Sequence, residues 1–353
     1  PDGRGIVLIA ETHENDTRYL RATSDGGLGF DAVWADDFHH VVHTAASHEH
    51  SGYYRDYDGT MDELARTINR GWLFEGQVSR HLKEARGTPS DRVDARQLVY
   101  FIQNHDQVGN RAFGRRFAQL VGTAAQKPWA ALQLLLPYTP MLFMGQEFVT
   151  SSRFYYFTDH NEELGRQIIE GRRQEFVWFT GVDESRGSEI PDPQAEQTFL
   201  DSKLNLEERE QGVGAERWAM NRELIALRKR DRVLRRQDRR QMRAIAASEQ
   251  MLLAHLWHGR EHRLIVANFG MAVDAPPSSA GVPTELASRD WQFVFSTEER
   301  RFGGTDDRVR FDAQMISLPP QTVVWLAATE PPLPARAWRR AVGAFAALRH
   351  RGT

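Results

Sequence analysis

Short apolar runs that end abruptly in polar residues alternate with helical patterns over the first half of the chain. Residues 6–10 are apolar and end in Glu11, and residues 98–102 are apolar and lead into Asn104 and Asp106. Apolar runs of this length, bounded by turn signals, are typical of buried strands. Strands that alternate with helices predict a fold of the α/β class with a parallel sheet.

The same pattern predicts four strand–loop–helix units. Strands are expected at residues 6–10, 28–35, 98–102 and 141–144, and helices at residues 61–70, 78–84, 124–136 and 215–230. Residues 181–211 are polar and contain two prolines, which predicts an excursion loop. From about residue 240 short apolar runs lie between turn residues, at 251–257, 263–269, 291–296 and 315–326. This second pattern predicts an antiparallel β domain without helices.

The change of pattern divides the chain. We expect an α/β domain over residues 1–238, with the loop 181–211 inside it, a β-sandwich over residues 239–328 and a basic tail over residues 329–353. The tail has five arginines and no acid from Ala335 onward, so we expect a disordered end or a surface helix. Because a strand pattern begins at residue 6 with no element before it, we expect the chain to begin inside a domain.

Composition limits the classes of partner. The chain has 353 residues, is 41% hydrophobic and carries a net charge of -3, so we expect no nucleic-acid partner. It has no apolar run of the length that a membrane span needs and no signal-peptide pattern, so we expect no membrane partner and a cytoplasmic location. It has no cysteine, which excludes disulfides and cysteine-based metal or nucleophile sites.

Glu11 and Asp106 are the first candidates for catalysis. Because residues just past parallel strands gather at one edge of the sheet, both carboxylates are expected at one pocket. Glycoside cleavage needs one carboxylic acid to protonate the leaving oxygen and, in retaining enzymes, a second carboxylate as nucleophile. An apolar pocket would raise the pKa of Glu11 and suit it to the acid role. Alternatively, Glu11 makes a surface or capping bond, and Asn104 and Asp106 bond to their own backbone.

A second polar cluster follows the second predicted strand. It consists of Asp36, Asp37, His39 and His40. Such groups bind either a metal or a polyhydroxyl ligand, and the spacing does not match a metal-ligand pattern. We therefore favour a sugar ligand and expect no metal and no cofactor. Nearby, His43, His48, Glu49 and His50 are expected to form a solvated loop.

Glu147 follows the fourth predicted strand and is a further candidate for the pocket. It serves equally well as a structural ion-pair partner. No glycine-rich phosphate loop adjoins a strand, which argues against nucleotide chemistry.

Together these segments resemble the alpha-amylase superfamily, glycoside hydrolase family 13, and within it the malto-oligosyltrehalose trehalohydrolase family. The resemblance extends from residue 1 to about residue 327, and the segments that carry it are residues 10–16, 31–40, 52–54, 101–110, 156–160, 191–194 and 202–204. Asn104-His105-Asp106 matches the superfamily, whereas residues 36–40, Asp-Asp-Phe-His-His, match the narrower family.

The resemblance implies a (β/α)8 barrel followed by a C-terminal antiparallel β-sandwich, with this chain holding barrel strands five to eight. It implies a retaining hydrolase that cleaves the α-1,4 bond next to the trehalose end of maltooligosyl trehalose. Glu11 would be the general acid/base and Asp106 the transition-state stabiliser. The residues that would bind the glucan substrate are Asn104, His105, Gln107, Asp37, His39, His40 and Glu147.

The chain also departs from the family pattern. The family nucleophile is an Asp in a Gly-Phe-Arg-x-Asp-Ala motif, whereas Gly29-Phe30-Asp31-Ala32 lacks the arginine and follows the acid strand. We therefore expect the nucleophile to be absent from these residues, an N-terminal half-barrel to be missing, and the chain to be inactive alone. Gln146 also stands where the family often has Glu. The alternatives are another superfamily enzyme, such as a branching enzyme or amylase, and a non-catalytic glucan-binding fragment.

Overall fold

The first half of the chain contains a four-stranded parallel sheet. The computed structural model describes residues 5–180, 190–305 and 309–330. The sheet has the order β1 (Ile9–Ala10), β2 (Ala32–Trp34), β5 (Leu98–Tyr100) and β6 (Thr139–Pro140). All three neighbouring pairs are parallel, so the four strands end at the same edge. The α/β class expected from the alternation is therefore present.

Helices cover this sheet. The longer ones are α1 (Asp36–Ser47), α2 (Met61–Arg70), α5 (Thr123–Leu135) and α8 (Gly212–Arg230). Helix α2 shows why the sequence signals work: the Thr60 hydroxyl accepts a hydrogen bond from the Glu63 amide at 3.2 Å, and Gly71 ends the helix at φ 99°. A Cβ at Gly71 would lie 2.5 Å from the Leu98 side chain, so a larger residue would clash with the third strand.

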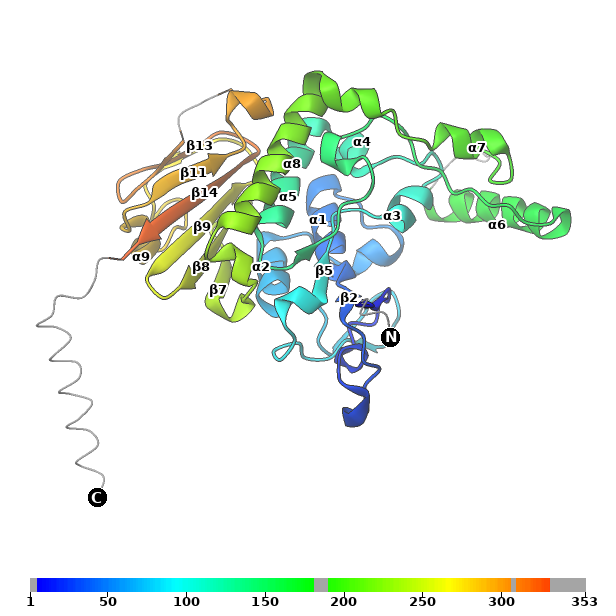
Figure 1. The fold of residues 1–353 in the computed structure, drawn as a ribbon, viewed down its shortest axis with the longest axis horizontal. Coiled ribbons are helices and arrows are strands. Elements are labelled where there is room, and N and C mark those ends of the chain that lie inside the picture. The colour runs from blue at the N-terminus through cyan, green and yellow to red at the C-terminus, as the bar shows by residue number, and fades with distance from the viewer. Residues whose placement is uncertain (1–4, 181–189, 306–308, 331–353) are drawn as a thin grey trace, which may run out of the picture.

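The second β region is an antiparallel sandwich. Its five-stranded sheet has the order β11 (Gln292–Ser296), β14 (Thr322–Thr329), β9 (Glu261–Asn268), β8 (Met251–His258) and β7 (Met242–Ala246). Its three-stranded sheet has the order β10 (Val273–Ala275), β13 (Ile316–Leu318) and β12 (Arg310–Phe311). Figure 1 shows helices α5 and α8 between this sandwich and the parallel sheet.

Strand β8 of the five-stranded sheet is buried on both faces. Along β8, Met251 and Leu253 belong to the core between the two sheets of the sandwich, whereas Leu252, Ala254 and Leu256 belong to the core shared with the helices. Successive strand residues point to opposite faces, so a strand covered on both sides is apolar at every position. This explains the apolar run at residues 251–254.

The remaining elements complete the described chain. They are the hairpin of β3 (Gln77–Val78) and β4 (Ala85–Arg86), the helices α3 (His105–Gly109), α4 (Phe117–Val121), α6 (Glu162–Thr180), α7 (Glu196–Asp201) and α9 (Thr284–Ala287), and single 3-10 turns. In Figure 1, α6 and α7 project from the body of the molecule.

Several predicted elements are wrong. Residues 78–84 form the end of β3 and the turn before β4 instead of a helix. The fourth strand is β6 at Thr139–Pro140 instead of residues 141–144, because Pro140, which was expected to break the chain before the strand, itself pairs with Tyr100 of β5. The run 315–326 divides into β13 and β14 on either side of a Pro-Pro turn, and the sandwich contains the short helix α9.

The excursion predicted at residues 181–211 is only partly a loop, since α7 and a 3-10 turn at Leu206–Glu210 lie within it; residues 181–189 lie outside the described residues. The proposed boundary after residue 238 stays a prediction, and β7 begins at Met242. Nearly all of the predicted basic tail, residues 331–353, also lies outside the described residues.

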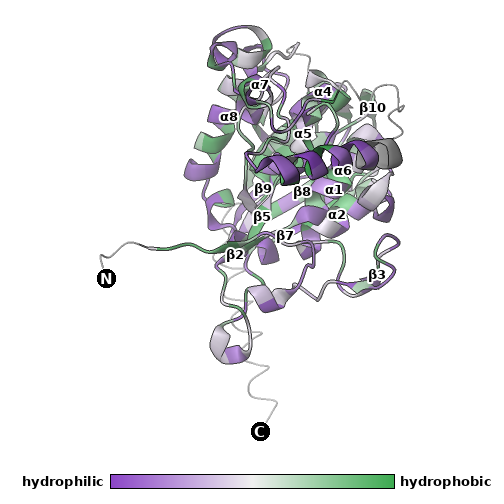
Figure 2. Cartoon of the chain, turned by 90° about the vertical axis from the view of Figure 1, so that its right-hand side faces the viewer, coloured by the Kyte–Doolittle hydropathy of each residue, from purple (hydrophilic) through white to green (hydrophobic). Residues whose placement is uncertain are grey.

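Strand β1 has a free edge. Among the strands of the described residues it pairs only with β2, and its apolar approach is exposed: Ile6 is 81%, Val7 69% and Leu8 52% accessible. Figure 2 shows this hydrophobic segment leaving the body of the molecule. An apolar strand edge of this kind is a surface on which another strand can pair.

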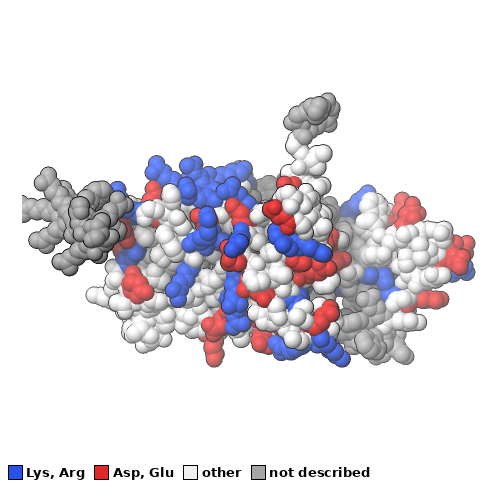
Figure 3. All heavy atoms as spheres, turned by 90° about the horizontal axis from the view of Figure 1, so that it is seen from below, with Lys and Arg blue, Asp and Glu red and all other residues white. Residues whose placement is uncertain are grey.

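Charge is spread over the surface. Figure 3 shows Lys and Arg side chains intermixed with Asp and Glu side chains on the face that it draws. Within the described residues, no helix combines the length and the apolar character needed to cross a bilayer.

Candidate active site

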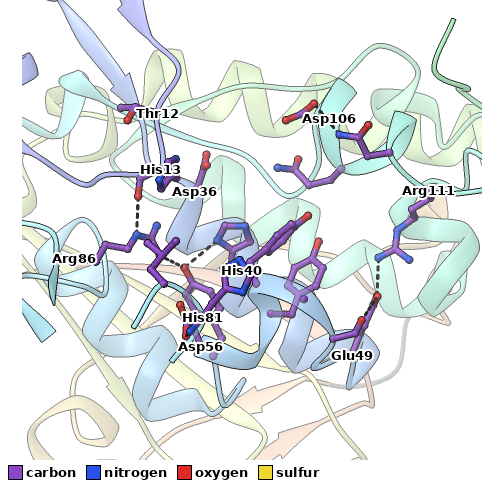
Figure 4. Close-up of a pocket in the computed structure, with 18 of the residues that line it drawn as sticks. Thr12, His13, Asp36, His40, Glu49, Asp56, His81, Arg86, Asp106 and Arg111 are labelled. Atoms are coloured by element: carbon purple, nitrogen blue, oxygen red, sulfur yellow. Dashed lines mark hydrogen bonds and ion pairs between the residues drawn. The ribbon is translucent and has the colours of Figure 1, made fainter. Parts of the chain in front are cut away.

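A cavity of about 540 Å³ lies where the parallel strands end. Its lining includes Glu11, Asp36, His40 and Asp106, which come from three different segments of the chain (Figure 4). Carboxylates, imidazoles and phenols from separated segments therefore face one space, and this is the kind of pocket in which a polar ligand is held by convergent groups.

Glu11 follows β1 directly and lines the cavity. Its side chain is exposed, so the apolar enclosure expected around it is not formed by the described residues. The free edge of β1 is on the same strand, and any element that paired there would also approach Glu11.

Asp106 reaches the cavity through a capped helix. Asn104 ends the strand segment, and its side-chain oxygen accepts hydrogen bonds from the amides of Asp106 at 2.9 Å and Gln107 at 3.1 Å. The Gln107 side chain in turn accepts from the Asn104 amide at 2.9 Å. This reciprocal cap starts α3 at His105 and presents Asp106 in its first turn.

The neighbours of Asp106 divide between structure and pocket. Gln107 lines the cavity. Asn104 is buried, and its side-chain oxygen accepts the two hydrogen bonds that cap α3. His105 is not among the lining residues, and its side chain is 53% exposed and packs edge-on against Trp34 at 6.2 Å. The expectation that Asn104 and His105 line the pocket is therefore not met.

Asp37 lies behind the pocket instead of lining it. It is fully buried and pairs with Arg86 at 2.9 Å. It also accepts hydrogen bonds from Tyr57 Oη at 2.6 Å, from Asn15 Nδ2 at 2.6 Å and from the amides of Leu73 and Phe74. Because both carboxylate oxygens of Asp37 already have protein partners, Asp37 has no free acceptor for a sugar hydroxyl. The expectation that Asp37 binds substrate is therefore corrected.

His39 is likewise a structural residue. Its Nδ1–H donates to the Ile102 carbonyl at 2.7 Å, and its Nε2 accepts from Tyr54 Oη at 3.0 Å. Both ring nitrogens are therefore used below the pocket. Burial holds the pKa of His39 well below the usual histidine value, so the ring is neutral.

His40 does line the pocket. Its Nδ1 lies 3.0 Å from the Tyr57 hydroxyl, which itself donates to Asp37, so the imidazole donates through Nδ1. Burial holds the pKa of His40 well below its usual value. A neutral ring with its proton on Nδ1 carries an acceptor at Nε2.

The residues expected to form a solvated loop divide into two sets. His48 and His50 follow α1 and are exposed, whereas His43 is buried in α1 and Glu49 lines the cavity. His43 in α1 pairs with Glu49 at 2.8 Å, and Arg111 of the next segment pairs with the same carboxylate at 2.6 Å. Although burial raises the pKa of Glu49, the bonds from His43 and Arg111 lower it to about 2. Glu49 and Arg111 both line the cavity, although neither was expected there from the sequence.

Asp36, a member of the polar cluster expected from the sequence, does reach the pocket. Asp36 lines the cavity together with His40, which lies four residues further along α1 and therefore on the same face of the helix. Burial is the largest influence on this carboxyl and raises its pKa to about 7. In a helix, residues four apart share a face, so Asp36 and His40 would face the pocket together and His39 and His43 would face away from it. Recognising α1 as a helix from the sequence would have separated these two pairs.

Glu147 does not line the cavity. It lies in the 3-10 turn Gln146–Phe148, where its backbone carbonyl accepts from Asn221 Nδ2 of α8 at 3.0 Å. Gln146 is buried and donates to the Gln133 side chain at 3.0 Å. The end of β6 therefore serves packing against α5 and α8, and the expectation for Glu147 is corrected.

Across the described ranges, no group of three or more histidine, cysteine, aspartate or glutamate side chains is arranged to hold a metal ion.

Comparison with known proteins gives relatives in one family. No family model matches the chain. The chain is 41% identical over 266 residues to malto-oligosyltrehalose trehalohydrolase of Deinococcus radiodurans, covering 75% of this chain and 43% of the relative. It is 35% identical over 324 residues to malto-oligosyltrehalose trehalohydrolase of Rhizobium sp. strain M-11, covering 90% of this chain and 50% of the relative.

Solved structures agree with this relationship. A protein of Salmonella typhimurium assigned as an alpha amylase matches with a TM-score of 0.74 and 29% identity, over 92% of this chain and 52% of that one. Trehalose-6-phosphate hydrolase of Bacillus licheniformis matches with a TM-score of 0.54 at 16% identity, over 92% of this chain and 56% of that one, which shows a shared fold alone. The chain spans about half the length of the curated relatives it matches, and it is similar in sequence to malto-oligosyltrehalose trehalohydrolases and in structure to a protein assigned as an alpha amylase.

Proposed function

We propose that this chain carries the general acid/base and the stabilising carboxylate of a retaining glycoside hydrolase that releases trehalose from maltooligosyl trehalose. The observation that carries the proposal is that Glu11, after β1, and Asp106, in α3 after β5, line one cavity at the carboxyl edge of a parallel sheet. The relatives named malto-oligosyltrehalose trehalohydrolase support the substrate class.

In this proposal Glu11 gives its proton to the oxygen of the α-1,4 bond as trehalose leaves, while a nucleophilic carboxylate attacks the sugar carbon. Glu11 then takes a proton from water, and that water attacks the same carbon, frees the nucleophile and restores the acid. Asp106 holds sugar hydroxyls and stabilises the positive charge that develops on the ring in each step.

Three further polar side chains would bind the remaining hydroxyls. His40 offers an acceptor at Nε2, and Gln107 offers an amide that is anchored by the cap of α3. Arg111 is held by its ion pair with Glu49 and offers N–H donors at the wall of the cavity that these two residues form (Figure 4). Groups fixed in this way bind a sugar with little loss of side-chain freedom.

We further propose that β1, β2, β5 and β6 correspond to barrel strands five to eight. The nucleophile would then come from a fourth strand that pairs with the free edge of β1, because that strand lies next to Glu11 in a closed barrel. Such pairing would also cover the exposed segment formed by Ile6, Val7 and Leu8.

Product analysis tests the function. The full-length protein is incubated with maltooligosyl trehalose, with maltoheptaose and with amylose, and the products are separated by chromatography. We expect free trehalose plus a shortened maltooligosaccharide from the first substrate. Maltose from maltoheptaose, or new branches on amylose, without trehalose release from the first substrate, would identify an amylase or branching enzyme. Sugar binding without any product would identify a non-catalytic glucan-binding protein.

A further inference from the structure

Asp36 is a pocket carboxyl with a buried oxygen that no described residue satisfies. It lies in the first turn of α1, where the preceding residue Ala35 provides no side-chain cap. Its Oδ1 atom is buried and has no hydrogen-bond partner within the described part of the chain. A buried oxygen without a donor is costly, and native proteins rarely leave one unsatisfied without a reason.

The surroundings of Asp36 differ from those of Asp37, its neighbour in the chain. Asp37 receives the Arg86 guanidinium at 2.9 Å together with four hydrogen bonds, so Arg86 is already committed. Asp36 lines the same cavity as Glu11 and Asp106 (Figure 4).

The charged groups around Asp36 have opposite effects. Arg86 of β4 favours its ionised form, whereas Asp37 on its own helix, Glu11 after β1 and Asp106 of α3 all oppose it. His40, on the same helix, is neutral because of its burial. Burial has the largest effect, and it raises the pKa of Asp36 to about 7.

We propose that Asp36 is a substrate-binding residue whose Oδ1 accepts a hydrogen bond from a hydroxyl of the sugar held between Glu11 and Asp106. This inference rests on the proposed function and adds a third carboxyl to the site. A sugar hydroxyl supplies the missing donor, and a hydrogen bond to a carboxylate is stronger than one between neutral groups. Because the sugar favours the ionised form, binding lowers the pKa of Asp36 and releases a proton near neutral pH.

The test is calorimetric titration of the full-length protein with maltotriose and with trehalose at pH 7, in buffers of different ionisation enthalpy. We expect proton release on binding of at least one sugar, and affinity that rises between pH 5.5 and pH 8. Asp36→Asn should abolish the release and flatten the pH dependence, and Asp36→Ala should weaken binding about tenfold, as expected for one lost hydrogen bond to a charged group.

Asp62→Asn is the matched control, because Asp62 lies in the first turn of α2, is exposed and is not part of the pocket. It should behave as the unaltered protein. Proton release and affinity that are unchanged in Asp36→Asn, with both sugars still bound, would overturn the role of Asp36 and leave the proposed function standing. Failure of the unaltered protein to bind either sugar would overturn both.

Discussion

The guanidinium of Arg86 lies 2.9 Å from Oδ1 of Asp37, and both side chains are almost fully buried. The pair joins β4 to α1 behind the pocket, and Tyr57 donates a hydrogen bond to the same Asp37 oxygen at 2.6 Å. Removing one member of a buried pair leaves the other charge uncompensated, and this is the origin of the first prediction.

Asp37→Asn should destabilise the protein by about 3–5 kcal/mol, because Arg86 would remain buried without its counter-charge. Denaturant unfolding measures this free energy. Asp58→Asn is the control, since its pair with Arg80 is exposed and such pairs contribute about 1 kcal/mol or less. A variant Asp37→Asn that kept full stability but lost sugar binding would restore Asp37 to the pocket lining.

Glu49 should stabilise the fold at neutral pH but not in acid. Its pKa of about 2 in the folded chain lies below the ordinary value of 4.5, because the bonds from His43 and Arg111 outweigh its burial. A lowered pKa contributes stability above the unfolded value and loses it as pH falls toward the folded value. Glu49→Gln should therefore lower the free energy of unfolding at pH 7, and this loss should disappear between pH 4.5 and pH 2. An equal loss at both ends of that range would show that packing is responsible.

Asp36 should have the opposite dependence. Its pKa is raised from 3.8 to about 7 in the folded chain. The contribution of the protonated carboxyl to the stability of the fold is therefore fully present below pH 4 and is lost as pH rises through 7. Asp36→Asn should be more stable than the unaltered protein at pH 8, by about 2 kcal/mol once solvent screening is allowed for, and nearly equal to it at pH 4. Melting temperatures across pH 4–8 check this, with Asp62→Asn as the control.

The elements with local signals could be predicted from sequence. Helix α2 occupies residues 61–70 as expected, because Thr60 and Gly71 mark its ends. The positions of Glu11 and Asp106 beside one cavity follow from a general property of parallel strands, whose carboxyl ends share an edge.

The rest of the site depends on contacts that no local pattern contains. Helix α1 buries polar residues whose partners, such as Tyr54, Tyr57 and the Ile102 carbonyl, come from other segments, so it lacks the apolar periodicity of an ordinary helix. Without the helix, Asp36 could not be separated from Asp37. Strand β6 was misplaced for a similar reason, because its pairing with β5 includes Pro140, a residue whose local signal is that of a break.

The exposed edge of β1 predicts how residues 1–353 behave when they are expressed alone. We expect poor solubility, since Ile6, Val7 and Leu8 are exposed beside an unpaired strand edge, and no release of trehalose. Adding the N-terminal half of the Deinococcus radiodurans relative, in cis or in trans, should raise both solubility and trehalose release. Full turnover by residues 1–353 alone would show that one of their own carboxylates is the nucleophile.

The role of Glu11 is the central claim, and turnover of maltooligosyl trehalose by Glu11→Gln in the full-length protein tests it most directly. General acid catalysis contributes about 10²–10⁴-fold, so kcat should fall by a factor in that range while the melting temperature stays nearly unchanged. Glu14→Gln is the matched control, because Glu14 is exposed, lies three residues away and is not part of the pocket, and it should keep full activity. A loss in kcat of less than about threefold for Glu11→Gln would contradict the account, because the acid would then lie elsewhere.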